Sequence, residues 1–220
     1  MGIREVEVAG QKLTIHELDD VYDSLTGCTL TGSWLWNSAF VLSEWMATQL
    51  DFKYKSVIEL GAGAGLPGLI AARLGASRVV LTDIGSLLPG LKENVEANGL
   101  KDRVEVRELE WGSTELLSQG GELEKFDVVL MSDVFYDPEE MARLALTLGM
   151  VCGEETRILA ACEVRPWTCE CLGELASRGF WVVEFPNLLR ESCSPLSDGD
   201  GNVETFAVYY IAKPCKQCTS

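Results

Sequence analysis

The chain has 220 residues, an apolar fraction of 47% and a formal net charge of −16. That length buries a full core, and we expect a single domain over residues 1–220. The charge argues against nucleic-acid backbones and anionic membrane surfaces as partners. It favours a basic protein segment, although the needs of solubility explain it equally well.

We expect no targeting or membrane segment, because no apolar run approaches about 18 residues and no cleavage pattern follows Met1.

Three of the eight cysteines, Cys28, Cys152 and Cys162, lie in or beside apolar segments, where a thiol packs as a small hydrophobe. Cys215-x-x-Cys218 is half of a zinc motif without a second half, and the single histidine, His16, is distant in sequence. We therefore predict no metal site and a reducing compartment, the cytoplasm with the nucleus as a further location.

The N-terminal region predicts a hairpin and a helix. Residues 5–8 and 12–16 alternate around Ala9-Gly10-Gln11, which is typical of two short antiparallel strands. A helix over residues 37–50 follows, with its apolar face formed by Phe40, Val41, Trp45 and Met46. We expect residues 1–50 to pack on the core of the domain.

From residue 57 onward, strands and helices alternate. Strands are predicted at 57–60, 78–82, 104–109, 126–131, 157–161, 180–185 and 205–212, and helices at 66–74, 86–98, 138–151 and 167–178. This order indicates an α/β fold with a mainly parallel, doubly wound sheet. Only a loop joins the last two strands, so the last strand should be antiparallel. A Rossmann-like sheet of seven strands with the last reversed is typical of class I methyltransferases, whereas a dinucleotide dehydrogenase would normally add a second half.

Residues 56–68, SVIELGAGAGLPG, predict a buried strand that ends in a glycine-rich turn and a helix. Gly63-x-Gly65-x-x-Gly68 formally matches a dinucleotide fingerprint. However, Glu59 stands just before Gly61, and a carboxylate there disfavours a pyrophosphate but suits the sulfonium cation of S-adenosylmethionine. We expect the missing Cβ atoms to open the backbone to this ligand. A tight turn with close helix packing would explain the glycines alone.

Three further acidic or hydroxyl residues follow strand ends. Asp83 closes the second strand of the sheet, where a carboxylate accepts both ribose hydroxyls of a nucleotide. Asp133 and Tyr136 lie just beyond a central strand, at the edge where open α/β sheets bind ligands. Asp133 could be an acid at a helix N-terminus, with Asp137 and Pro138 as the cap. Alternatively, Asp133 and the Tyr136 hydroxyl surround an incoming amine.

Taken in order, five short motifs resemble those of the family-16 seven-β-strand methyltransferases. This lysine methyltransferase-like group acts on chaperones and other cytosolic proteins. The motifs are Gly32-x-x-Leu35-Trp36-Asn37-Ser38-Ala39, Glu59-Leu60-Gly61-Ala62-Gly63, Thr82-Asp83, Leu109-Glu110-Trp111-Gly112 and Ser132-Asp133-Val134-Phe135-Tyr136. The resemblance covers nearly the whole chain. It implies transfer of a methyl group from S-adenosylmethionine to a lysine ε-amine of a cytosolic protein such as a chaperone.

The resemblance also implies residue roles. Asp133 and Tyr136 would shape the target-lysine site, and the cofactor would lie against Trp36, Glu59, Gly61, Ala62, Gly63, Asp83, Trp111 and Ser132. Within that set, Trp111 would border the adenine and Trp36 would lie over the pocket, and Glu59 would partly support the turn. Composition alone would allow both tryptophans to be ordinary core residues.

The chemistry of such a transfer needs neither a metal nor a covalent intermediate, because a sulfonium methyl is already activated. The amine must be neutral and aligned, and Asp133 would orient it while Tyr136 donates or accepts a hydrogen bond.

Two other classes of function stay open: a methyltransferase for a small molecule or a non-lysine side chain, and a non-catalytic cofactor-binding module. The acidic loop 186–204, with Glu191, Asp198, Asp200 and Glu204, either recruits a basic segment or is simply solvated. The oligomeric state stays unknown.

Overall fold

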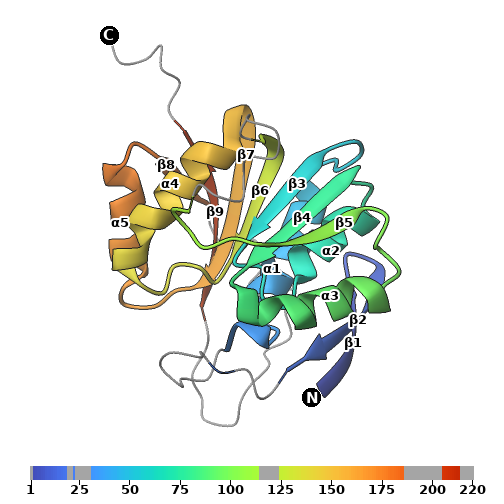
Figure 1. Cartoon of the computed structure of the whole chain (residues 1–220). Helices are drawn as coiled ribbons and strands as arrows, with labels where there is room; N and C mark the ends of the chain where they lie inside the picture. The colour runs from blue at the N-terminus through green and yellow to red at the C-terminus, as the bar shows by residue number, and fades with distance from the viewer. Residues whose placement is uncertain (1, 19–21, 23–30, 114–123, 186–204, 214–220) are drawn as a thin grey trace.

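A computed structural model describes residues 2–18, 22, 31–113, 124–185 and 205–213. A seven-stranded sheet runs in the order β5-β4-β3-β6-β7-β9-β8 (Figure 1). Its strands are β3 (Ser56–Leu60), β4 (Arg78–Asp83), β5 (Val104–Glu108), β6 (Phe126–Ser132), β7 (Cys152–Glu163), β8 (Trp181–Phe185) and β9 (Phe206–Ala212). β3 to β7 are parallel and β9 is antiparallel, which confirms the predicted fold class.

The position of β9 adds to the prediction. β9 pairs with β8, as expected, but it also pairs with β7 along Ile158–Glu163, so it lies between these two strands. β7 also begins five residues before the predicted start. Its first part is irregular, because the Thr156 hydroxyl accepts the Gly153 N–H and donates to the Phe126 carbonyl where the register with β6 shifts.

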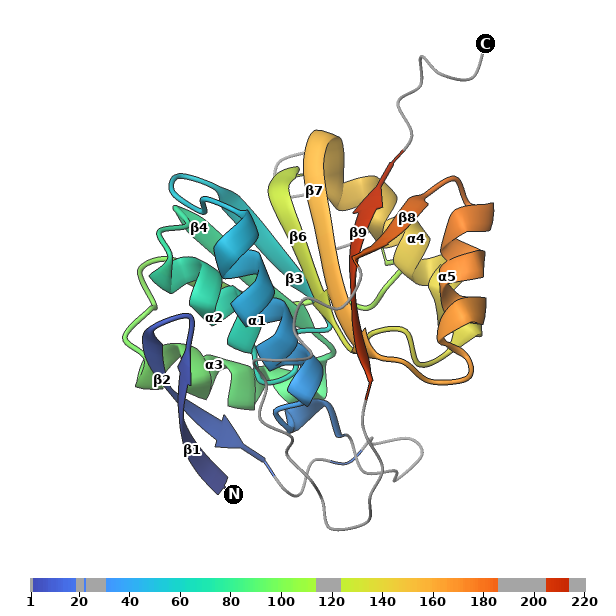
Figure 2. The ribbon, with the colours of Figure 1, turned by 180° about the vertical axis from the view of Figure 1, so that it is seen from behind.

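Helices cover both faces of the sheet. α1 (Asn37–Gln49), α2 (Leu66–Arg73) and α3 (Leu88–Ala97) lie on one face, and α4 (Met141–Val151) and α5 (Thr168–Ser177) lie on the other (Figure 2). Alternate strand residues supply the two cores: Val57 and Leu130 face the first group, and Ile58 and Val129 face the second. Three short 3₁₀ turns, η1 (Thr31–Ser33), η2 (Gly85–Leu87) and η3 (Pro138–Glu140), precede α1, α3 and α4.

The N-terminal hairpin, β1 (Gly2–Val8) and β2 (Gln11–Glu17), forms a separate two-stranded sheet. Two asparagines, one in α3 and one at its C-cap, hold the outer edge of the hairpin. The Asn94 amide accepts the His16 N–H at 2.7 Å and donates to the His16 carbonyl, while the Asn98 amide does the same for Thr14. The Asn94 amide also donates to the Ala64 carbonyl at 3.0 Å. Side chains therefore replace a neighbouring strand, and they connect the hairpin to the glycine turn.

Burial supports the packing role expected for two of the cysteines. Cys152 and Cys162 are buried free thiols, and burial raises the pKa of each to about 12. Within the described ranges, no cluster of three or more His, Cys, Asp or Glu side chains could hold a metal ion. The helices described there are too short or too polar to cross a membrane. Cys28, Cys215, Cys218 and loop 186–204 lie outside the described residues.

Candidate active site

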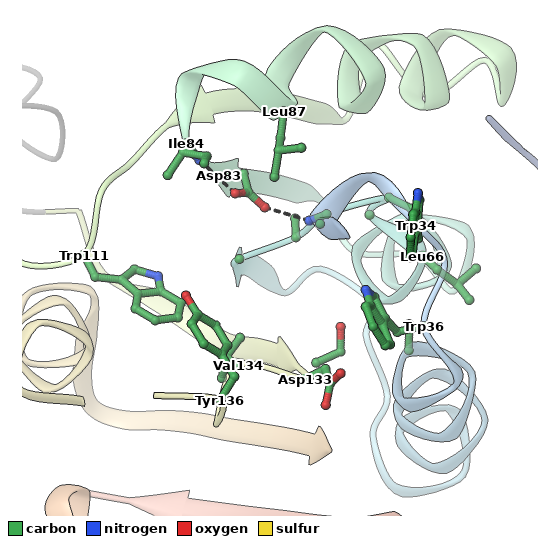
Figure 3. A pocket seen from close by; sticks show the side chains of 18 of the residues that line it. Trp34, Trp36, Leu66, Asp83, Ile84, Leu87, Trp111, Asp133, Val134 and Tyr136 are labelled. Atoms are coloured by element: carbon green, nitrogen blue, oxygen red, sulfur yellow. Dashed lines mark hydrogen bonds between the residues drawn. The ribbon is translucent and has the colours of Figure 1, made fainter. Parts of the chain in front are cut away.

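A cavity of about 720 Å³ lies at the carboxyl ends of the central strands (Figure 3). This is the edge where the strand order diverges on the two sides of β3, and where open α/β sheets bind ligands. Its volume is in the range of cofactor sites. Nine of the ten predicted site residues line it: Trp36, Gly61, Ala62, Gly63, Asp83, Trp111, Ser132, Asp133 and Tyr136. The tenth, Glu59, is not among the lining residues.

The glycine turn connects β3 to α2 through three residues with positive φ, Gly61, Gly63 and Gly65. The space beside two of them serves packing rather than ligand access. A Cβ on Gly63 would overlap the Gly32 carbonyl oxygen, and one on Gly65 would lie 2.8 Å from Leu91 Cδ1. The expectation that the missing Cβ atoms open the backbone to a ligand is therefore wrong at these two positions. Gly63 instead lets η1 close over the turn.

Backbone donors of the turn are engaged within the protein. Four N–H groups are used: Ala62 donates to the Thr82 carbonyl, Gly63 to Asp83 Oδ2, Gly65 to the Ala62 carbonyl, and Gly68 to Glu59 Oε2, all at 2.7–2.9 Å. A pyrophosphate binds at a helix N-terminus through free N–H donors. Here two of the acceptors are carboxyl groups, and one of them, Asp83, lines the cavity, so the turn presents an acid where a phosphate would need donors.

Glu59 and Asp83 differ in position. Glu59 is fully buried behind the turn; burial raises its pKa well above the ordinary value, against the hydrogen bond from Gly68. Its second oxygen, Oε1, has no hydrogen-bond partner among the described residues. Glu59 is thus a support for the turn. Asp83 lines the cavity, and burial raises its pKa although it accepts the N–H groups of Gly63 and Ile84.

Aromatic rings flank the cavity. The Trp111 and Tyr136 rings lie 6.1 Å apart on one side, and Trp34 and Trp36 lie 6.4 Å apart on the other (Figure 3). Trp36 is 37% exposed, and Trp111 is a partly buried residue at the edge of the core. Both tryptophans therefore form walls of the cavity and are not ordinary core aromatics. The apolar side chains of Ile84, Leu87, Leu109 and Val134 also line the cavity, so it offers apolar and aromatic walls to a flat ring.

Asp133 makes an ion pair that the sequence did not reveal. Its φ is 56°, and its N–H extends the β6–β7 ladder to the Ala161 carbonyl. Both carboxylate oxygens accept hydrogen bonds from the Arg165 guanidinium at 3.1 Å, and Arg165 also donates to Glu163 Oε2 at 2.7 Å. The alternative reading is confirmed in its cap, because Asp137 accepts the Glu139 N–H at the start of η3. The Asp133 carboxylate, however, binds Arg165 rather than the backbone of that turn.

Tyr136 faces a different part of the cavity from Asp133. Its hydroxyl lies beside Trp111, whereas the Asp133 carboxylate is on the side of Trp36 (Figure 3). Burial, and then the charges of Glu140, Asp83 and Asp137, raises the pKa of Tyr136 to about 12, although half of the residue is exposed. The structure therefore does not bring the two predicted catalytic groups to one point.

Solved structures share the fold. The ribosomal protein L11 methylase from Lactobacillus delbrueckii subsp. bulgaricus matches with a TM-score of 0.58 at 17% identity, over 79% of this chain and 77% of that one. The Thermus thermophilus 16S rRNA N2 G1207 methyltransferase, solved with AdoMet and guanosine, matches with a TM-score of 0.62 at 18% identity, over 97% of this chain and 50% of that one.

Sequence comparison is more specific. Mouse protein N-lysine methyltransferase METTL21A is 40% identical over 136 residues, 60% of each chain. Mouse protein-lysine methyltransferase METTL21E is 35% identical over 163 residues, 71% of this chain and 63% of that one. The chain thus spans somewhat under two thirds of the length of these relatives. A family model described as lysine methyltransferase matches residues 12–171. The resemblance inferred from the five motifs is confirmed, and the chain belongs to the lysine methyltransferase family.

Proposed function

We propose that this protein is an S-adenosylmethionine-dependent protein-lysine N-methyltransferase. One observation carries the choice of cofactor: the N–H groups of Gly63 and Gly68 already bind the carboxylates Asp83 and Glu59. A turn whose donors are used by acids suits a cationic ligand better than a diphosphate. The solved neighbour with AdoMet and the two METTL21 relatives support the same choice.

The lining residues fit the parts of this cofactor. Asp83 keeps lone pairs for the ribose hydroxyls beyond the two N–H groups that it accepts. The apolar and aromatic walls of the cavity exclude water from the adenine, and the backbone from Gly61 to Gly63 borders the methionine part. When bound, the cofactor supplies a methyl group activated by its sulfonium. The protein then has to bring a neutral amine into line with it.

A lysine amine with an ordinary pKa of about 10.4 is protonated at pH 7, and removing that proton costs about 4–5 kcal/mol. Alignment of the reactants contributes about 7–11 kcal/mol, so the site has to supply position first and proton loss second. Asp133, whose side chain is 10% exposed and lines the cavity, is placed to orient the amine. Tyr136 stays protonated, since its pKa is about 12, and its hydroxyl can hydrogen-bond the substrate from the opposite wall.

For the substrate we propose a lysine in a basic segment of a cytosolic protein, with a chaperone as the first candidate. The net charge of −16 and the acids Glu110, Glu140 and Asp133 around the cavity support a cationic partner. The motif resemblance supports the chaperone. A relative from Xenopus tropicalis named EEF1A lysine methyltransferase 3, 36% identical over 133 residues, makes EEF1A a second protein to test. The cytoplasm is the proposed compartment, and nucleic acid and membranes are not proposed as partners.

Calorimetry tests the cofactor first. We expect heat from S-adenosylhomocysteine and none from NAD or FAD, and the reverse result would remove the methyltransferase proposal. Incubation with tritiated S-adenosylmethionine and a cell lysate tests the substrate. Label mapped to a protein lysine, and reduced in Asp133→Asn while S-adenosylhomocysteine still binds, supports the proposal. Label found only in small molecules would favour the small-molecule alternative, and tight cofactor binding without label would favour a non-catalytic module.

A further inference from the structure

The ion pair between Asp133 and Arg165 lines the cavity that we propose as the lysine site. The guanidinium engages both Asp133 oxygens, contacts Glu163, and lies 5.7 Å from the centre of the Trp36 ring. Both Asp133 and Arg165 line the cavity. An amine that approaches Asp133 therefore meets a carboxylate whose charge is already offset by a resident cation.

Among the described residues, none of the other charged groups around the cavity takes the place of Arg165 beside Asp133. They are Asp83 from β4, Glu110 after β5, Glu140 from η3 and Arg143 from α4. Glu163, at the end of β7, is not a lining residue but contacts Arg165. Arg143 is largely exposed and pairs with Glu140 at 3.3 Å. The Tyr136 hydroxyl is neutral, since its pKa is about 12. Arg165 is thus the described cation that touches Asp133.

An unpaired carboxylate would hinder the proposed reaction. A carboxylate beside an amine favours the protonated ammonium, which cannot accept a methyl group, and raises the amine pKa by about 1–3 units. A guanidinium beside the same carboxylate opposes that effect. The two Asp133 oxygens offer about four lone-pair sites, so they can accept from the amine while Arg165 uses one site on each.

From this geometry we infer that Arg165 is a positioning residue for the target amine. It offsets the Asp133 charge so that the bound lysine loses its proton near neutral pH, while the Asp133 oxygens still orient the amine. The inference rests on the proposed lysine methylation.

Several contacts hold Arg165 in place for this role. Its backbone N–H donates to the Thr168 hydroxyl at 3.0 Å, which fixes the turn between β7 and α5. Burial lowers the pKa of Arg165, but the charges of Asp133 and Glu163 raise it by more, so the group stays cationic. Glu163 is itself anchored at the end of β7, paired with Phe206 of β9.

The test measures kcat/KM against pH for the full chain with cofactor and a lysine-containing protein substrate, from about pH 6 to about pH 10. In Arg165→Gln we expect the acidic limb to move to higher pH by about one to two units, so that activity at pH 7 falls about 10–100-fold and recovers at high pH. In Asp133→Asn we expect the limb to move to lower pH, with a lower plateau. Arg165→Lys keeps the charge and should keep the limb near the wild-type position.

Arg178→Gln is the matched control, because it removes the same charge from an exposed pair with Glu174 on α5 and should leave the profile unchanged. A limb that stays in place in Arg165→Gln, with only a lower plateau, would overturn the inference in favour of a purely structural role. So would limbs that move in the same direction in Arg165→Gln and Asp133→Asn. Higher activity of Arg165→Gln at every pH would show that Arg165 blocks the site. If the wild type methylates no lysine, the proposed function fails as well, and S-adenosylhomocysteine calorimetry shows whether the cofactor site survives.

Discussion

Replacing Gly63 by alanine tests whether the turn is built for packing by η1. Gly63 has a φ of 54°, which costs alanine about 1–2 kcal/mol. The new Cβ would also overlap the Gly32 carbonyl, and displacing that backbone adds about 1–3 kcal/mol. We therefore expect Gly63→Ala to lower the free energy of unfolding by about 2–5 kcal/mol.

Gly99→Ala is the control for this prediction. Gly99 has a similar φ of 64°, and a Cβ there would meet nothing within 4 Å, so only the backbone cost of about 1–2 kcal/mol should appear. Urea denaturation measures both variants. Because Gly32 leads into the segment that carries Trp34 and Trp36, Gly63→Ala should also weaken S-adenosylhomocysteine binding by about tenfold, whereas Gly99→Ala should not. Equal destabilisation of the two variants, with equal affinities, would refute the packing argument.

Three more outcomes are expected. Asn94→Ala removes three hydrogen bonds, two to His16 and one to Ala64, and should lower the free energy of unfolding by about 2–4 kcal/mol in urea; a loss below about 1 kcal/mol would contradict the role of this amide. Burial raises the Glu59 pKa above its ordinary value of 4.5, so the folded state holds a proton that the unfolded state releases between the two values. Wild-type stability therefore falls as pH rises from the ordinary value towards the raised one. Glu59→Gln has no proton to lose, so its free energy of unfolding in urea should increase relative to that of the wild type over this range; a relative decrease would show that the raised pKa is wrong. Tyr136→Phe should lower kcat about threefold to tenfold without changing the shape of the pH profile below about pH 10, because the pKa of this hydroxyl is about 12; a lost inflection would assign it a titrating role.

The sequence predicted the elements well where periodicity and end signals agree. The predicted helices at 37–50 and 66–74 match α1 and α2 to within one residue. For α2 the ends are marked by Gly65, Pro67 and Gly75, whereas α1 was found from its apolar periodicity. The order of the strands in the sheet could not be predicted in the same way. The strand at 205–212 was found, but its place between β7 and β8 depends on long-range contacts that no local pattern encodes.

The candidate site was predicted where residues follow strand ends, and missed where the partner comes from a loop. Asp83 and Asp133 were found because the carboxyl ends of β4 and β6 meet at one edge. Arg165 was missed because a single arginine after a strand has no pattern of its own; its spacing of two from Glu163 at the end of β7 was the available signal. Glu59 was placed too close to the ligand, since a strand with four buried residues hides its charged one.

The insertion of β9 has a consequence for the order in which this chain acquires its structure. β8 pairs only with β9 in the described sheet, yet it leaves the ribosome first. Before β9 is synthesised, the backbone N–H and C=O groups of β8, which begins at the exposed Trp181, have no strand to pair with. Strands β3 to β7 can already pair with one another at that stage. The half that carries the glycine turn should thus mature early and the β8–α5 half late. Hydrogen exchange on ribosome-bound chains of increasing length would record this as protection of β8 that appears only after β9 has been synthesised.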